Sequence, residues 1–520
     1  MKAFLLHEDQ DFDLQRELPP NEQALTQDLE LNILFEAMAL GDKFLFDVAK
    51  KAVLTSLNDP EAIVYRQQIL GDCLEQSTTV RAIYDIAVET IDGQRKLWGW
   101  FSQSPDSILH RSVEVLQFYV GMLKKLRSIA DEHAAKFQSK GLARFFTMLA
   151  EELDDEYFRV VQDHLGQLRF RDGVLISAEL GKGNMGTQYI LRRAPKQSWM
   201  KRFSVIDRSA FTFRIADRDE SGAQALAELR GRGINLVANA LAQSTDHILS
   251  FFSMLRSELG FYVGCLNLQR QLAQKSEPTR FPVPLGPGAT ALSFHGLYDV
   301  CLALSLQQRV VGNDVAADDK LLVLVTGANQ GGKSTFLRSI GLAQLMMQCG
   351  MFVPAESFCS NVCDGIFTHF KREEDATMKS GKLDEELSRM SEIADKLSPN
   401  GILLCNESFA ATNEREGSEI ARQIIRALLE AGVKIVFVTH LFDLAQSLYL
   451  QKMDAALFLR ADRQPDGRRT FRVVEGSPLP TSYGEDLYER IFGAVHVGSG
   501  RFAQPSGDPA RAEYPARREQ

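Results

Sequence analysis

A glycine-rich segment at residues 327–335 has the residue types and spacing that bind nucleotide phosphates. In order, its residues are Gly327, Ala328, Asn329, Gln330, Gly331, Gly332, Lys333, Ser334 and Thr335. This order fits the pattern G-x-x-x-x-G-K-S, in which the lysine reaches the β- and γ-phosphates and the serine binds Mg²⁺. The glycines let backbone N–H groups converge on phosphate oxygens without Cβ clashes. The segment therefore predicts a site for a nucleotide and Mg²⁺.

The sequence on either side supplies the strand and the helix that such a loop requires. Residues 321–325 form a short apolar run that is typical of a buried parallel strand. Residues 336–347 have helical spacing, and a helix starting at the loop directs the positive end of its dipole toward a bound anion. Strand, loop and helix are thus in the order that phosphate binding needs.

A second apolar run, residues 401–405, ends in the polar pair Asn406 and Glu407. In ATPases with a phosphate loop, the first position supports Mg²⁺ through a water, and the second orients or deprotonates the attacking water. Glu407 fits the catalytic position, whereas Asn406 stands where an aspartate is expected. Asparagine accepts a hydrogen bond from a metal-bound water but carries no charge, so we expect weaker Mg²⁺ binding. The alternative is a plain core strand.

Two further stretches contain candidate nucleotide-binding residues because of their local sequence. A third apolar run, residues 434–439, ends at His440, where a polar residue faces the ligand crevice of an open α/β sheet. His440 is then placed to bond the γ-phosphate or the attacking water, the alternative being a structural histidine. Ser380 and Gly381 precede an acidic stretch at an expected helix start, where a hydroxyl and backbone N–H groups suit a phosphate.

Composition limits the possible functions. A net charge of −9 gives no global sign of nucleic-acid binding, so DNA contact requires a local basic patch or backbone groups. No apolar run approaches the roughly 18 residues that cross a bilayer, and the N-terminus turns acidic too early for a signal peptide. The 7 cysteines have no regular spacing and fit a reducing cytosol. We expect a cytoplasmic protein without membrane contact.

The chain divides into segments of different character. The expected segments are a helical region (1–165), a β-rich basic insertion (166–215), returning long helices (216–285), an α/β nucleotide-binding domain (286–495) and a disordered tail (496–520).

Local signals refine this division at several points. Asp59 and Pro60 mark a helix start, and Asp172–Gly173 predicts a hairpin turn between residues 168–171 and 174–176. One apolar stripe in the returning helices recurs every 3.6 residues and is interpreted as core packing. It comprises Ile248, Phe251, Phe252, Leu255, Leu259, Tyr262 and Leu266.

Taken together, these motifs resemble those of the MutS family of DNA mismatch repair ATPases. The loop is similar to the family's form, which usually has Pro and Met at the positions of Ala328 and Gln330. The spacing from Glu407 to Thr412 and Gly417 is the family's as well. Further matching segments are 312–314, 350–357, 364–368, 439–444 and 482–484.

The resemblance implies both a fold and an activity. The fold is multidomain: a helical lever and core region with a small β insertion, then an α/β P-loop NTPase domain of the ABC-type ATPase class. The chain would bind ATP and Mg²⁺, with Asn313 beside the adenine. It would act as a homodimer with composite sites, in which Ser380 and Gly381 of one subunit complete the site of the other. The insertion would stand where double-stranded or branched DNA is clamped.

The insertion is rich in basic residues, as phosphate contacts require. It holds ten basic residues, interleaved with Trp199 and Phe203, against the three acids Asp172, Glu179 and Asp207. The alternative is a solvated basic surface. The basic residues are Arg169, Arg171, Lys182, Arg192, Arg193, Lys196, Lys201, Arg202, Arg208 and Arg214.

Departures from the family leave alternatives open. Full-length members begin with a mismatch-reading domain, for which we find no room ahead of the helical region, so direct mismatch recognition is not expected. No nuclease-like domain follows the ATPase, which disfavours the branch that carries one. One alternative is a nucleotide-gated DNA- or protein-binding module with little hydrolysis, favoured by Asn406. Another is a clamp-forming ATPase that acts on a protein or structured nucleic acid and not on mismatches.

Overall fold

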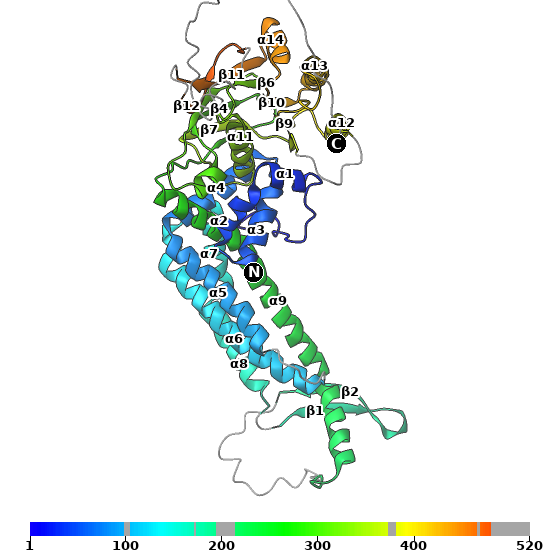
Figure 1. Cartoon of the computed structure of the whole chain (residues 1–520). Coiled ribbons are helices and arrows are strands. Elements are labelled where there is room, and N and C mark those ends of the chain that lie inside the picture. The colour runs from blue at the N-terminus through cyan, green and yellow to red at the C-terminus, as the bar shows by residue number, and fades with distance from the viewer. Residues whose placement is uncertain (98–103, 171–172, 194–213, 373–380, 465–467, 480–520) are drawn as a thin grey trace, which may run out of the picture.

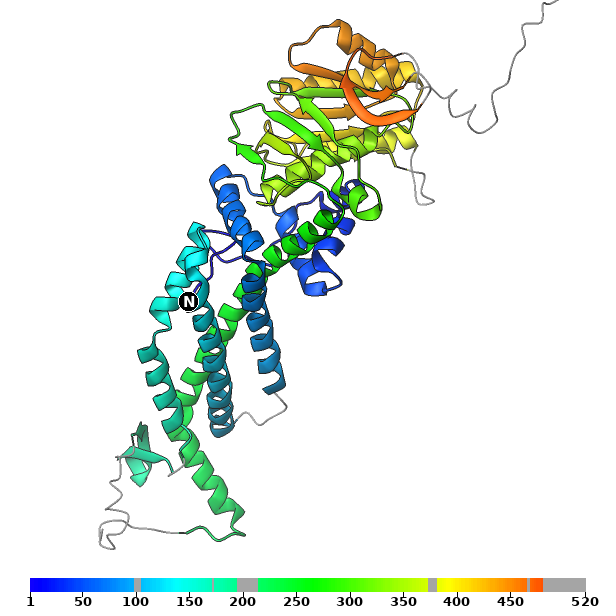
Figure 2. The same ribbon diagram turned by 90° about the vertical axis from the view of Figure 1, so that its left-hand side faces the viewer.

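The protein is elongated, with an α/β domain at one end and a hairpin at the other (Figures 1 and 2). The computed structural model describes residues 1–97, 104–170, 173–193, 214–372, 381–464 and 468–479. A helical region connects the two ends. This mixed architecture of helices and an α/β sheet confirms the expected fold class in outline.

The helical region is built from helices with clear start signals. Asp59 accepts hydrogen bonds from the backbone N–H groups of Glu61 and Ala62, with Pro60 at the first helical position, as predicted. Ser104 caps the longest of the first eight helices. These helices are α1 (Glu22–Asp28), α2 (Leu31–Ala39), α3 (Lys43–Leu54), α4 (Pro60–Glu75), α5 (Ser77–Leu97), α6 (Pro105–His133), α7 (Lys140–Glu152) and α8 (Asp155–Gln167).

A single helix of 55 residues, α9 (Glu220–Gln274), returns along α5 and α6. It extends from the α/β domain to the far tip of the molecule (Figures 1 and 2). We call α5, α6, α8 and α9 the helical arm. The apolar stripe of α9 is buried apart from the half-buried Ile248, with Phe252 and Leu255 fully buried, which confirms its interpretation as core packing. Each such side chain contributes about 2 kcal/mol through removal from water.

The hairpin at the tip differs from its predicted position. Its strands are β1 (Leu175–Leu180) and β2 (Gly186–Arg192), and Gly181 N–H donates to Met185 O across the turn at 2.8 Å. The predicted strand at 168–171 is not formed at its described residues, 168–170, which follow directly on the end of α8 at Gln167 and where Phe170 packs beside Leu109 and Ile234. Asp172 lies outside the described residues. The turn is instead formed by a glycine-rich stretch at residues 181–186.

A six-stranded sheet forms the centre of the α/β domain. In spatial order its strands are β12 (Arg469–Glu475), β11 (Ala456–Arg463), β6 (Leu322–Gly327), β10 (Lys434–Val438), β9 (Ile402–Asn406) and β8 (Ile366–Phe370). Only β12, at one edge, pairs antiparallel. Helix α11 (Lys333–Gln348) packs on one face, and α13 (Glu414–Glu430) and α14 (Phe442–Leu450) pack on the other. Both faces are covered, which explains the continuous apolar runs of the central strands.

A second sheet of this domain has four strands. Its order is β3 (Val283–Leu285), β7 (Ser357–Asn361), β4 (Leu292–Leu297) and β5 (Asn313–Ala316). The short helix α10 (Val300–Ser305) connects β4 to β5, and α12 (Lys382–Ala394) precedes β9.

The helical region and the α/β domain share one continuous core. Leu57 N–H donates to Gln348 O at the end of α11, and Arg66 donates to the carbonyl oxygens of Leu6 and Cys349. Arg66 is almost fully buried. Helix α11, which begins at the glycine loop, is therefore connected to the helical region through packed side chains and buried hydrogen bonds.

Candidate nucleotide-binding site

The glycine loop joins β6 to α11 in a conformation that needs its glycines. Gly327 and Gly332 have φ values of 111° and 88°, in the left-handed region that favours glycine. A Cβ on Gly331 would lie 2.7 Å from Ala461 Cβ and 2.9 Å from Ala328 O. Both distances are shorter than van der Waals contact, so a side chain there would displace the loop from β11.

Lys333 is the first residue of α11 and is buried beneath the loop. Its Nζ donates to the carbonyl oxygens of Gly327 at 3.0 Å and Ala328 at 2.9 Å. Burial lowers the pKa of Lys333 to about 8, although the charge of Glu407 acts in the opposite direction. The ammonium is thus mostly protonated at neutral pH and points into the loop that a phosphate would occupy.

Ser334 and Asn406 meet at the carboxyl edge of the sheet. Ser334 Oγ donates to Asn406 Oδ1 at 3.0 Å, although 72 residues separate them in sequence. The described residues contain no group of three His, Cys, Asp or Glu side chains that could hold a metal. A cation here would therefore rely on the hydroxyl of Ser334, the amide oxygen of Asn406 and the carboxylate of Glu407, together with phosphate and water oxygens.

Glu407 and His440 form a direct pair. The Nε2 atom of His440 lies 2.9 Å from Oε1 of Glu407. This hydrogen bond is the largest cause that lowers the pKa of Glu407, with smaller contributions from the charges of Lys371 and Lys333, while burial opposes them. An ionised carboxylate only accepts, so Nε2 of His440 carries the proton. Glu407 also has a φ of 55°, a left-handed conformation that is uncommon outside glycine and concentrated at functional sites.

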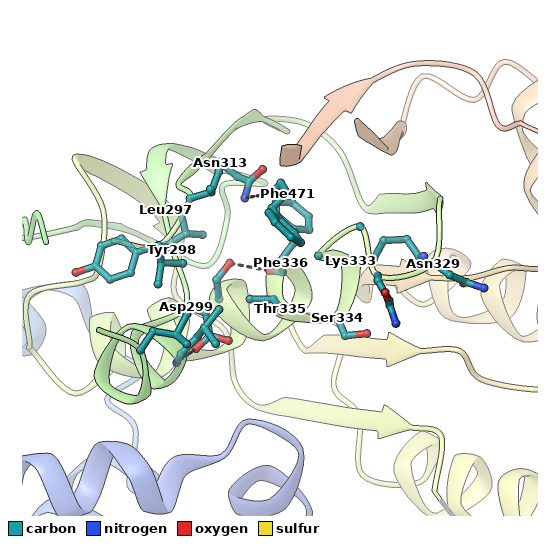
Figure 3. Close-up of a pocket in the computed structure, with 18 of the residues that line it drawn as sticks. Leu297, Tyr298, Asp299, Asn313, Asn329, Lys333, Ser334, Thr335, Phe336 and Phe471 are labelled. Atoms are coloured by element: carbon teal, nitrogen blue, oxygen red, sulfur yellow. Dashed lines mark hydrogen bonds between the residues drawn. The ribbon is translucent and has the colours of Figure 1, made fainter. Parts of the chain in front are cut away.

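A pocket of about 430 Å³ lies between the loop and the four-stranded sheet (Figure 3). This volume is within the range of small-molecule sites. One end is polar and holds the glycine loop, Glu407 and His440. The other end is mostly apolar and is lined by Leu297, Tyr298, Leu302, Leu306, Val310, Phe336 and Phe471. A polar end for phosphates and an apolar end for a base are the two parts that a nucleotide needs.

Asn313 lines the pocket and also ties β12 to β5. Its Oδ1 accepts from Val473 N–H at 2.7 Å, and its Nδ2 donates to Phe471 O at 3.5 Å. Phe471 has a φ of 58° and adds its ring to the pocket lining. Asn313 therefore lies beside the apolar end of the pocket and holds Phe471 in place (Figure 3), and its place beside an adenine stays a prediction.

Ser380 and Gly381 are not part of this pocket as described. Ser380 lies outside the described residues, and Gly381 is the residue before α12 and is absent from the pocket lining. Their assignment to the site of a second subunit stays a prediction. Segment 482–484 and the predicted tail at 496–520 also lie outside the described residues.

Three residues at the site carry no signal in the sequence. Arg469 Nε donates to Asn329 O of the loop at 3.2 Å, and Phe471 follows on the same edge strand. Buried Asp299 caps α10 and accepts from Arg338 of α11 at 2.5 Å. Asp299 and Phe471 reach the pocket, and Arg469 reaches the loop, through the pairing of strands or helices distant in sequence, so local patterns could not reveal them.

Two family models match the chain. A model described as the MutS2 N-terminal domain matches residues 58–275, which include the arm and the hairpin. A model described as MutS domain V matches residues 323–491, which include the glycine loop, Glu407 and His440. The chain belongs to the MutS family. The resemblance drawn from the motifs is thereby confirmed.

Curated members of the MutS family align with this chain over only part of their own length. The DNA mismatch repair protein MutS of Thermotoga sp. (strain RQ2) is 36% identical over 182 residues, which are 35% of this chain and 23% of the relative. The protein of that name from Lactobacillus delbrueckii subsp. bulgaricus is 30% identical over 225 residues, or 41% and 26%. The MutS protein homolog 4 of Mus musculus is 25% identical over 248 residues, or 47% and 25%. The chain thus aligns with about a quarter of each of these MutS relatives.

The tip of the arm presents part of the predicted basic patch. Arg169, Lys182, Arg192, Arg193 and Arg214 are exposed, and the other basic residues of the insertion lie outside the described residues. Arg192 bonds Ser177 across the hairpin, and Arg193 lies 3.8 Å from Asp163. Within the described part of this MutS-family chain, no helix has the length and hydropathy to cross a bilayer.

Proposed function

We propose that the chain binds ATP with Mg²⁺, hydrolyses it, and couples its nucleotide state to dimerisation and DNA binding. The observation that carries this proposal is the Glu407–His440 pair, at 2.9 Å, in the same pocket as the buried ammonium of Lys333. A polarised carboxylate beside a phosphate-binding loop is the arrangement that activates water for phosphoryl transfer. Membership of the MutS family supports a general role in mismatch repair or DNA maintenance.

The residues of the loop fit a nucleoside triphosphate. Backbone N–H groups of Asn329 to Gly332 and the start of α11 suit phosphate oxygens, and Lys333 neutralises their charge. Ser334 and Asn406 would hold Mg²⁺, and that ion would neutralise charge on the β- and γ-phosphates. Asn406 brings no charge, so the ion is held with one carboxylate fewer than an aspartate at this position would provide.

Glu407 and His440 have different roles toward the attacking water. The lowered pKa of Glu407 keeps its carboxylate ionised at neutral pH, ready to accept a hydrogen bond or a proton from that water. His440 donates to the same carboxylate and fixes its orientation. Because His440 also lines the pocket, it is within reach of the transferred phosphoryl group.

The arm offers a route from this site to DNA. Exposed basic residues on the hairpin and at the start of α9 suit contacts with the phosphate backbone, which carry no sequence information. Helix α9 extends from that tip back to the α/β domain, where its end contacts α10. In the proposed homodimer, Ser380 and Gly381 of each subunit complete the nucleotide site of the other, so ATP binding and dimerisation reinforce each other.

The decisive experiment changes Glu407→Gln, which keeps the size of the side chain and removes its basicity. We expect ATP binding within about twofold of the unaltered chain and turnover reduced by about a hundredfold or more. Phosphate release and ATP affinity are measured with and without duplex, mismatched, branched and single-stranded DNA. Unchanged turnover would remove Glu407 from this role, and no response to any DNA would overturn the DNA-coupled part.

A second candidate is a nucleotide-gated binding module with little hydrolysis. The contact of Ser334 with neutral Asn406 favours it, because the metal position lacks the charge of an aspartate. This candidate keeps ATP binding and dimerisation and differs only in a negligible rate of phosphate release.

A further inference from the structure

The segment that follows α9 contacts the apolar wall of the nucleotide pocket at successive residues. Lys275, directly after the helix, donates through Nζ to the carbonyl oxygens of Ala303, Leu304 and Leu306, each at 2.7 Å. These carbonyls belong to the last turn of α10 and the residue beyond it. Leu302 and Leu306 of this same stretch line the apolar end of the pocket.

Glu277 holds the next part of the same wall. Its side chain is 1% exposed, and Oε1 accepts from Val310 N–H at 2.7 Å. Pro278 O accepts from Tyr298 OH at 3.0 Å. Val310 and Tyr298 both line the pocket, so residues 275, 277 and 278 each bond a part of its wall.

The chemistry of these contacts makes them specific and costly to lose. The last carbonyls of a helix lack partners within it and carry partial negative charge, which an ammonium satisfies. Hydrogen bonds from charged donors are roughly twice as strong as neutral ones. In α10, which has six residues, the carbonyl oxygens of Ala303 and Leu304 both accept from Lys275. Neither Lys275 nor Glu277 is itself part of the pocket lining.

We propose that Lys275 and Glu277 are positioning residues for the nucleoside part of the bound nucleotide, an inference that rests on the proposed ATP site. They act through Leu302, Leu306 and Val310 and leave the phosphate end to the glycine loop. Because Lys275 is the residue directly after α9, a displacement of the arm reaches the base-side wall through these contacts. The arm thereby influences affinity for nucleosides more than affinity for phosphates.

The test compares ligands with and without a nucleoside. Dissociation constants for ATP, ADP and inorganic tripolyphosphate are measured on the full chain and on Lys275→Met. We expect ATP and ADP to bind about tenfold more weakly to the variant, with tripolyphosphate unchanged within about twofold. Turnover at saturating ATP should also stay within about twofold, because the wall acts on binding and not on the water.

Matched variants separate positioning from general damage. Lys275→Arg keeps a cationic donor and should restore most of the affinity for ATP. Arg270→Met removes a positive charge from an exposed site near the same helix end and should have no effect. Glu277→Gln keeps an acceptor for Val310 N–H and should be milder than Glu277→Ala.

The outcomes that overturn the inference are distinct. Equal ATP affinity of Lys275→Met and the unaltered chain overturns it while leaving the ATP site intact. A parallel loss of tripolyphosphate binding also overturns it, because the effect would then be on the whole site. If the unaltered chain binds no ATP, the proposed function fails and this inference fails with it.

Discussion

His440 Nε2 lies 2.9 Å from Glu407 Oε1, and this contact joins the ends of two strands at the carboxyl edge of the central sheet. Glu407 follows β9 and His440 follows β10 by two residues. The bond lowers the pKa of Glu407 and fixes the orientation of its carboxylate. A change of either residue should therefore affect catalysis through the other.

The first prediction concerns the pH dependence of turnover. Turnover needs ionised Glu407, and the bond from His440 lowers the pKa of that carboxyl. Removing the bond with His440→Ala raises this pKa, so the acid limb of kcat should move to higher pH. At pH 7.5 we expect turnover reduced by about a hundredfold with ATP affinity retained. His247→Ala, at an exposed position on α9, is the control. An acid limb that does not move would contradict this reading.

The second prediction concerns proton uptake on ATP binding. Burial lowers the pKa of Lys333 to about 8, and nearby phosphates would raise it again. Above pH 8 the free site has lost its proton and the bound site keeps it, so binding takes up a proton. ATP affinity should then fall with rising pH, by up to about tenfold per pH unit. Calorimetry in buffers of different ionisation enthalpy measures this uptake. The Lys333→Arg variant stays charged and should show no proton uptake. An ATP affinity of the unaltered chain that does not change between pH 7 and 9.5 would refute the role assigned to Lys333.

The sequence predicted the part of the site that parallel strands bring together. Ser334, Asn406, Glu407 and His440 each follow an apolar run, and the carboxyl ends of parallel strands meet at one edge. The structure joins them in two hydrogen-bonded pairs, Ser334 with Asn406 and Glu407 with His440. Local pattern was sufficient here because the geometry of a parallel sheet fixes where such residues lie.

The apolar end of the pocket could not be predicted from the sequence, for a physical reason. Phe471 reaches it on β12, an antiparallel edge strand whose position depends on pairing with β11 and on the bonds of Asn313. The predicted hairpin around Asp172–Gly173 was wrong for a related reason, because its first strand is not formed at the described residues 168–170. Packing of Phe170 against Leu109 and Ile234 decided that segment, and such tertiary contacts leave no mark in a local pattern.

The third prediction concerns the uncharged metal position. Asn406→Asp keeps an acceptor for the hydroxyl of Ser334 and adds a negative charge. The Mg²⁺ concentration for half-maximal turnover should fall by about tenfold. Mg²⁺ titrations of phosphate release measure this, with Asn406→Ala as the variant that removes both acceptor and charge. A large gain in rate at saturating Mg²⁺ would favour the module with little hydrolysis as the natural state. An unchanged Mg²⁺ requirement would show that residue 406 does not support the ion.

The fourth prediction concerns stability and a buried carboxyl in the helical region. Glu258 of α9 is 0% exposed, and its carboxyl oxygens accept from Leu5 N–H at 2.6 Å and Phe12 N–H at 3.4 Å. Burial raises the pKa of Glu258 from 4.5 to about 7, although both hydrogen bonds and the charge of Arg66 oppose the shift. The folded protein therefore keeps this proton at pH values where the unfolded chain has lost it.

The sign of the effect follows from that difference in proton binding. The stabilisation is fully present below pH 4.5 and is lost as the pH rises to 7, by about 3 kcal/mol at most. Urea unfolding of the full chain at several pH values measures this slope. Glu258→Gln cannot ionise, so its free energy of unfolding should vary less between pH 5 and 8 than that of the unaltered chain. An equal slope in the two proteins would show that Glu258 does not hold its proton through this range. A smaller slope in the variant would mean that ionisation of Glu258 weakens the packing of the N-terminal segment against α9 as the pH approaches neutrality.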